Sequence, residues 1–331
     1  MNSSELGAGA GSTDVPVNIV QGTHSELIAY LVFNLWPSHF GIPLLLLVIL
    51  LSKGRIQRHA TFINFLVVWI VVGISSVLLL YAGKHTGPEP PKMLCLFQSS
   101  MIYGMPPMTS TAAFALVFQM FLVIRGAYHG VIVSDRDSLW RTLCLLVGPY
   151  VALFITAIST AIVGAANPRK ISRDRRFFYC SVENNTLTNV MSLATSCILV
   201  LTVIFEVWTV VLLFKHSRAL RRNGVSILRT MDLSFPIRII AFGFYILIAL
   251  SLNLISITSP QTPVPDLIIS TASSVVLFIF GTQTDILLAL CFWRRNSTPP
   301  KVPDKDSPVI NVTLSDPEAS WKDGKPPAAW N

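Results

Sequence analysis

Charged residues are scarce in this sequence. Only 13% of its 331 residues are Asp, Glu, Lys or Arg, whereas about 25% is usual in soluble proteins. Hydrophobic residues make up 52%, and the mean hydropathy is +0.60. This balance excludes an ordinary soluble domain and indicates that lipid surrounds most of the chain.

Patterns that support catalysis are also missing. The sequence has no phosphate-binding glycine loop, and its apolar segments contain no His, Cys, Asp or Glu clusters at metal-ligand spacing. We therefore expect no enzyme activity, no cofactor and no bound metal. Residues 1–26 lack the basic start and apolar centre of a signal peptide, so we expect no cleavable one.

Long apolar runs are what the sequence does have. A helix rises 1.5 Å per residue, so roughly 20 apolar residues cross about 30 Å of hydrocarbon. Seven segments reach this length: 27–51, 60–82, 95–124, 140–164, 188–214, 238–258 and 267–292. They predict an all-α membrane protein, a seven-transmembrane helix bundle over 27–293. Residues 1–26 and the tail 294–331 are predicted to be disordered.

The placement of basic residues predicts how the bundle is oriented. Of the 25 Lys and Arg, 18 lie on the side of the bundle that holds the tail, and seven lie on the other. Basic residues favour the cytoplasmic side. The N-terminus is therefore expected outside and the C-terminus in the cytoplasm, although segment 165–187 carries five basic residues on the predicted outside. The net charge of +8 thus indicates contact with the lipid bilayer and not with nucleic acid.

This orientation predicts which cysteines can form a disulfide and which asparagines can be glycosylated. Of the five cysteines, Cys95 and Cys180 both fall on the oxidising outer side. We expect a disulfide between them that closes a long stretch of chain; two unpaired thiols are the alternative. Asn2 and Asn184 begin Asn-x-Ser/Thr acceptors on the same side and are candidates for glycosylation.

Seven spans, an outside N-terminus and the two outer cysteines resemble G-protein-coupled receptors. The segments CLFQSSMIYG at 95–104 and FGTQTDILLAL at 280–290 are similar to fungal (basidiomycete-type) seven-transmembrane receptor-like proteins, and there is a more distant likeness to a-factor-type pheromone receptors. The resemblance implies a multi-pass plasma-membrane receptor that senses an extracellular ligand. It also implies a heterotrimeric G protein as partner and signalling by a two-state helix rearrangement.

Departures from the rhodopsin-like pattern are clear. The inner end of the third span has Arg125 within Val-Ile-Arg-Gly instead of an Asp-Arg-Tyr triplet, and 267–292 has no Asn-Pro-x-x-Tyr motif. Segment 267–292 also lacks lysine, which excludes a retinal Schiff base.

Polar side chains in the spans gather toward the cytoplasmic half. Such groups are costly in hydrocarbon, so they tend to face the bundle and to have partners. An arginine paired with a carboxylate would form a polar switch; simple helix–helix hydrogen bonding or snorkelling to the interface is the alternative. The switch candidates are Asn64, Gln119, Arg125, Glu206, Arg238 and Asp285.

Two further groups of residues are candidates for binding. A cationic run and three aromatics precede Cys180, where they would cover the bundle and favour a ligand with a negative group; a solvated loop that binds headgroups is the alternative. The ligand-cavity candidates are Tyr103, Met105, Thr109, Phe177, Phe178 and Tyr179. On the inner side Arg218, Arg221 and Arg222 would contact a G protein or the acidic inner leaflet.

A multi-span transporter or channel is the alternative function. Transporters usually place ionisable residues near the midplane and show internal repeats. Here the charged groups lie toward one end, which favours the receptor.

Overall fold

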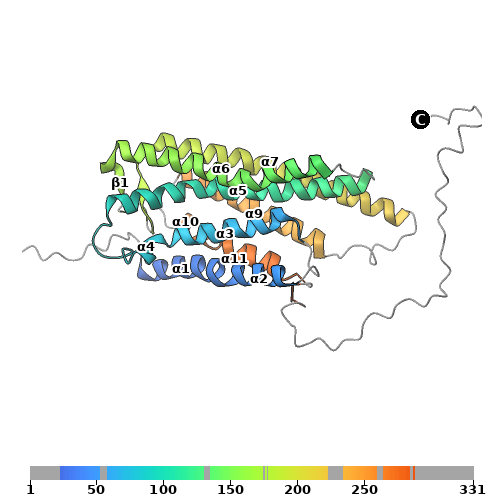
Figure 1. The fold of residues 1–331 in the computed structure, drawn as a ribbon, viewed down its shortest axis with the longest axis horizontal. Coiled ribbons are helices and arrows are strands. Elements are labelled where there is room, and N and C mark those ends of the chain that lie inside the picture. Colours follow the sequence, from blue (N-terminus) through green and yellow to red (C-terminus); the bar gives the residue numbers. More distant parts are fainter. Residues whose placement is uncertain are drawn as a thin grey trace, which may run out of the picture. The chain divides into compact units, whose positions relative to one another are not determined.

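The computed structural model describes residues 23–52, 58–129, 135–173, 176, 178–222, 234–258, 264–283 and 286–287. Within them the chain is helical apart from one small hairpin and short turns (Figure 1). The elements in order are α1 (His24–Leu35), η1 (Trp36–Gly41), α2 (Ile42–Leu51), α3 (Ala60–Ser76), α4 (Leu78–Tyr81), α5 (Lys92–His129), α6 (Asp135–Ala166), η2 (Pro168–Lys170), β1 (Ile171–Ser172), β2 (Ser181–Val182), α7 (Asn185–Arg222), α9 (Ser234–Thr258), α10 (Val264–Ser270) and α11 (Ala272–Gly281).

Five helical stretches are long and apolar enough to cross a membrane. They are His24–Leu51, Lys92–Gly126, Leu139–Ala166, Asn185–Lys215 and Val264–Gly281. Each overlaps a span expected from the sequence, so the helical membrane class is supported by length and composition.

The two remaining expected spans, 60–82 and 238–258, are not among these five. The segment 60–82 is not one helix, because α3 ends at Ser76 and α4 begins only after Val77. Helix α9 has 25 residues and covers the whole of 238–258, and its described apolar part runs over Ala241–Leu252. Five spans, not seven, therefore meet the length criterion among the described residues.

The hairpin β1–β2 was not expected from the sequence. Its strands have two residues each and pair antiparallel, with Ile171 opposite Val182 and Ser172 opposite Ser181. It lies between α6 and α7 and contacts α5. The hairpin holds the segment that contains Cys180 against the bundle.

Helix α5 packs against α3, α6 and α7, while α9 contacts α7, α10 and α11. The core between them is mostly aliphatic, with a group of aromatic rings inside it. The ring of Phe65 lies edge-on to those of Trp69, Phe242 and Phe280, at centroid separations of 6.2, 5.6 and 6.0 Å. Edge-to-face aromatic pairs of this kind each add about 0.5–1.5 kcal/mol beyond their area burial. They join α3, α9 and α11 in the middle of the bundle.

Glycine allows the first helical stretch to lie close to α3. A Cβ placed on Gly73 would come within 2.0 Å of the Ser38 hydroxyl in η1.

At its start, α1 is fixed by a capping box: Glu26 N–H donates to Thr23 Oγ1 at 3.3 Å, and Thr23 N–H donates to the Glu26 carboxylate at 2.7 Å.

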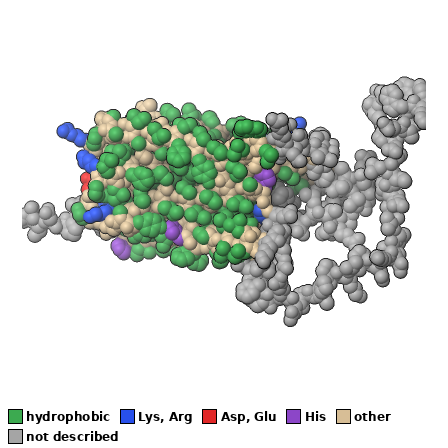
Figure 2. All heavy atoms as spheres, viewed as in Figure 1, with side chains coloured by type: hydrophobic (Ala, Val, Ile, Leu, Met, Phe, Trp, Pro, Cys, Tyr) green, Lys and Arg blue, Asp and Glu red, His purple; other side chains and the backbone are tan. Residues whose placement is uncertain are grey.

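The outer surface of the helices is apolar. Figure 2 shows hydrophobic side chains over the middle of the visible face, with Lys and Arg toward its ends. On α6, for example, Ile155, Ile158 and Ile162 are all more than half exposed. Such a surface is unfavourable in water and suits contact with lipid.

Candidate functional site

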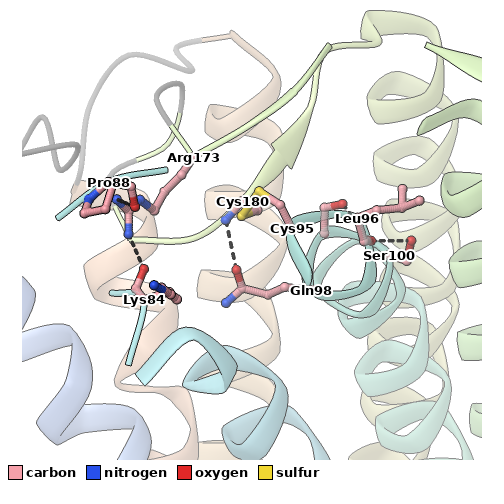
Figure 3. Close-up of a disulfide and its surroundings, with 9 residues drawn as sticks. Lys84, Pro88, Cys95, Leu96, Gln98, Ser100, Arg173 and Cys180 are labelled. Carbon is pink, nitrogen blue, oxygen red and sulfur yellow. Dashed lines mark hydrogen bonds between the residues drawn. A yellow bond between two sulfur atoms is a disulfide. The ribbon is translucent and has the colours of Figure 1, made fainter. Parts of the chain in front are cut away.

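A disulfide between Cys95 and Cys180 closes one end of the bundle, which we call the disulfide end (Figure 3). This confirms the pairing expected from the sequence. Both cysteines are fully buried and pack with Leu79 and Ile171. The Cys180 N–H also donates to Gln98 Oε1 at 3.1 Å. The start of α5 and the segment before β2 are therefore joined by a covalent bond and a hydrogen bond.

Arg173 connects the same segment to the turn that follows α4. Its guanidinium donates to the carbonyls of Lys84, Gly87 and Pro88, the last two at 2.7 and 3.3 Å (Figure 3). Only 1% of Arg173 is exposed. Gly87 has φ +88°, a conformation that glycine adopts at little cost, and this lets the turn point its carbonyls at the guanidinium.

We call residues 167–184, between α6 and α7, the covering segment or cover. A cavity of about 460 Å³ lies beneath its residues Arg176 and Tyr179. Side chains from α1, α3, α5, α7, α9, α10 and α11 line it, together with Arg176 and Tyr179 of the covering segment. Its volume lies within the about 300–1,000 Å³ usual for small-molecule sites. Most of the lining is apolar or aromatic, including Phe65, Trp69 and Leu199.

The two charged residues of the lining, Arg176 and Asp266, lie where the covering segment meets α10. The Tyr179 hydroxyl donates to Asp266 Oδ1 at 3.0 Å. Asp266 is 7% exposed, and its Oδ2 has no hydrogen-bond partner among the described residues. Tyr179, followed by Asp266 and Tyr103, raises the pKa of the Arg176 guanidinium, against the opposing effect of burial. Burial also raises the pKa of the Tyr179 phenol well above its ordinary value.

Four of the six residues expected at the cavity line it: Tyr103, Met105, Thr109 and Tyr179. Tyr103 donates its hydroxyl to the Val182 carbonyl at 3.0 Å and so links α5 to the hairpin.

The remaining two expected cavity residues differ. Phe178 is buried outside the lining and stacks on Tyr30, with ring centroids 4.6 Å apart. Phe177 lies outside the described residues.

Sequence reasoning missed Asp266 and Tyr30. Asp266 comes directly before the apolar run assigned to the seventh span, and Tyr30 lies one turn inside the first. A carboxyl at the edge of an apolar run was a usable signal for Asp266. For Tyr30 no pattern distinguished it from packing residues.

At the opposite end of the bundle, Asn64 joins α3 to α6. Its Nδ2 donates to the Leu146 carbonyl at 3.1 Å, and its Oδ1 accepts from the Tyr150 hydroxyl at 2.8 Å. Arg238 of α9 donates to the carbonyls of Ile279 and Thr282 at 2.6 and 2.8 Å, at the C-terminal end of α11. A cation there complements the negative end of the helix dipole.

Glu206 lies at the contact between α7 and α9. It is 5% exposed, and a Cβ placed on Gly243 would fall 2.3–2.6 Å from its carboxyl atoms. Its Oε1 has no hydrogen-bond partner in the described part of the chain. Gln119 is buried too, whereas Arg125 is exposed on α5. Asp285, the last switch candidate, lies outside the described residues.

The remaining sequence candidates fall at the helix ends. Arg218 is exposed on α7, while the side chains of Arg221 and Arg222 are outside what the structure describes. Asn184 caps α7, since its Oδ1 accepts from the Leu187 N–H at 3.0 Å. Asn2 is also outside the described residues.

Within the described ranges, no group of three or more His, Cys, Asp and Glu side chains could hold a metal ion. The cavity has one polar end, formed by Arg176, Tyr179 and Asp266, and the rest of its lining is mostly apolar. No protein-family model matches the sequence, and a search of curated proteins found no relative.

Proposed function

We propose that this chain is a seven-span plasma-membrane receptor, with the disulfide end outside, that binds a small extracellular ligand and signals to a heterotrimeric G protein. The observation that carries the proposal is the cavity under the disulfide-held cover. Ligand contacts made there reach seven helices at once.

Helix α9 is the element through which binding would act at the opposite end. It lines the cavity with Phe244, Tyr245 and Ile248. Near its start, the same helix is held by Arg238 and by the close approach of Gly243 to Glu206. A ligand that fits better when α9 shifts would act against these contacts.

The energies involved suit a two-state element. The two charge-assisted hydrogen bonds that Arg238 donates contribute about 1.5–3 kcal/mol each to the stability of this helix arrangement. A ligand changes the equilibrium only by its differential affinity for the two states. A hundredfold preference, about 2.7 kcal/mol, is of the size needed to release one of these contacts.

Nucleotide exchange in membranes tests the proposal. The chain would be co-expressed with a panel of G-protein α subunits, and basal exchange would be compared with membranes that lack it. We expect exchange above background with at least one subunit, and a change in that rate in Glu206→Ala and Asp285→Ala at equal surface level.

Two results would count against a receptor. Exchange at background level with every subunit, for the wild type and both variants, would refute coupling. Solute flux through proteoliposomes without exchange would instead identify a transporter that uses the same cavity.

A further inference from the structure

The polar end of the cavity presents one cation and one anion. Arg176 and Asp266 both line it, and each acts electrostatically on the other. Their formal charges cancel. An ion entering this end would be attracted by one group and repelled by the other, while losing its own hydration.

Each of the two groups retains hydrogen-bonding capacity. Asp266 uses Oδ1 to accept from Tyr179, and its Oδ2 has no partner among the described residues. Arg176 is only partly buried at the cavity edge, where its guanidinium provides five N–H donors in a planar fork. The site therefore offers donors and one buried acceptor side by side. A head group that both accepts and donates would satisfy them together.

The part of the cavity wall formed by α9 and α10 determines which kind of ligand body fits below the head group. Phe244 and Ile248 of α9 and Ile268 and Ile269 of α10 line the cavity, yet each is 41–67% exposed on the outer surface. In a bilayer that surface meets lipid chains. The cavity is thus bounded on this side by side chains that also face lipid, which favours an apolar ligand body.

From these contacts we infer that the cavity binds an uncharged amphiphile, with a head group of the amide type held between Arg176 and Asp266 and an apolar chain lying against α9. The amide carbonyl accepts from the guanidinium, and the amide N–H donates to the carboxylate. This inference rests on the cavity of the proposed function but not on coupling to a G protein.

Three probes of equal chain length distinguish an uncharged, an anionic and a cationic head group: decanamide, decanoic acid and decylamine. Binding would be measured by competition with a fluorescent decanamide derivative on the full chain in lipid nanodiscs, with no G protein present. Wild type should bind decanamide about tenfold more tightly than either charged probe.

Removing one charge should reverse the preference in opposite directions. In Asp266→Asn the uncompensated Arg176 should favour decanoic acid about tenfold over decylamine. In Arg176→Gln the uncompensated Asp266 should favour decylamine by a similar factor. Arg169→Gln and Glu183→Gln, which change exposed charges of the same covering segment, serve as matched controls and should bind like wild type.

The inference is overturned if all three probes rank alike in wild type, Asp266→Asn and Arg176→Gln, or if no probe binds saturably. If either variant fails to fold, Asp266→Glu and Arg176→Lys keep the charges and test the head-group geometry, because both should weaken decanamide without gaining a charged probe. Binding as expected without nucleotide exchange would uphold the inference while refuting the proposed coupling.

Discussion

His85 gives the bundle a stability that depends on pH. It lies in the turn whose carbonyls bind Arg173, and it is only 6% exposed. Neither ring nitrogen has a hydrogen-bond partner among the described residues. Burial first, and the neighbouring Arg173 guanidinium second, lower the pKa of His85 from 6.5 to about 4. The folded protein therefore keeps this imidazole neutral where an unfolded chain protonates it.

The direction of the effect follows from proton binding. Between about pH 4 and pH 6.5 the unfolded chain binds the additional proton, so stability rises with pH and is lost as pH falls through this window. For a pKa of 6.5 in the unfolded chain and about 4 in the folded one, the loss relative to neutral pH is about 2 kcal/mol near pH 5. Near pH 4 it grows to about 3 kcal/mol.

Denaturation of the purified protein in mixed micelles, followed across this pH range, measures the effect. His85→Gln cannot take up the proton, so its free energy of unfolding should fall about 2 kcal/mol less than that of wild type between neutral pH and pH 5. His24→Gln, at an exposed histidine near the same end, is the control and should follow wild type. Parallel pH curves for wild type and His85→Gln would show that the buried ring does not remain neutral, and the reasoning would be wrong.

Three other predictions concern the helix contacts. Replacing Cys95 and Cys180 by serine opens a loop with a sequence separation of 85 and should cost about 4 kcal/mol, seen as a lower thermal midpoint; an unchanged midpoint would contradict it. Gly243→Ala should destabilise wild type, because its Cβ would displace the Glu206 carboxyl, but should stabilise Glu206→Ala by about 0.5–1 kcal/mol through helix propensity; equal effects in both backgrounds would be incompatible with the contact. Tyr150→Phe should lower stability by about 1 kcal/mol by removing the hydrogen bond donated to α3, and chemical denaturation would reveal no loss if that bond is not formed.

The sequence was most informative where one physical rule dominates. Apolar length alone located five helices of membrane-spanning length, because hydrocarbon solvation leaves few alternatives to a helix. It failed at 60–82, where α3 stops. There the Ser75 and Ser76 hydroxyls donate to the carbonyls of Val71 and Val72, and Val77, with φ −101° and ψ 16°, leaves helical geometry before α4 begins. Hydropathy is averaged over many residues, so it does not detect such a local change in the backbone.

The cavity was predictable only in part for a different reason. Tyr103 and Tyr179 could be placed because one follows Cys95 on a helix and the other precedes Cys180, so the disulfide fixes both. Asp266 joins them because α10 packs against α1 and α9, which brings its carboxylate within hydrogen-bond distance of the Tyr179 hydroxyl. Periodicity shows which face of a helix is apolar, but it does not show which helices become neighbours.

The basic segment between α6 and α7 shows the same limit for charge. Counting its five basic residues opposed the orientation that the other segments favour. The count treats every side chain as free to meet lipid headgroups. Arg173 is instead buried among three backbone carbonyls, and Arg176 lies at the cavity beside Asp266. Two of the five charges are thus used inside the protein, where they hold the cover in place and define the polar end of the cavity. Charge bias predicts orientation only after such residues are removed from the count, and without them this segment opposes the other segments less strongly.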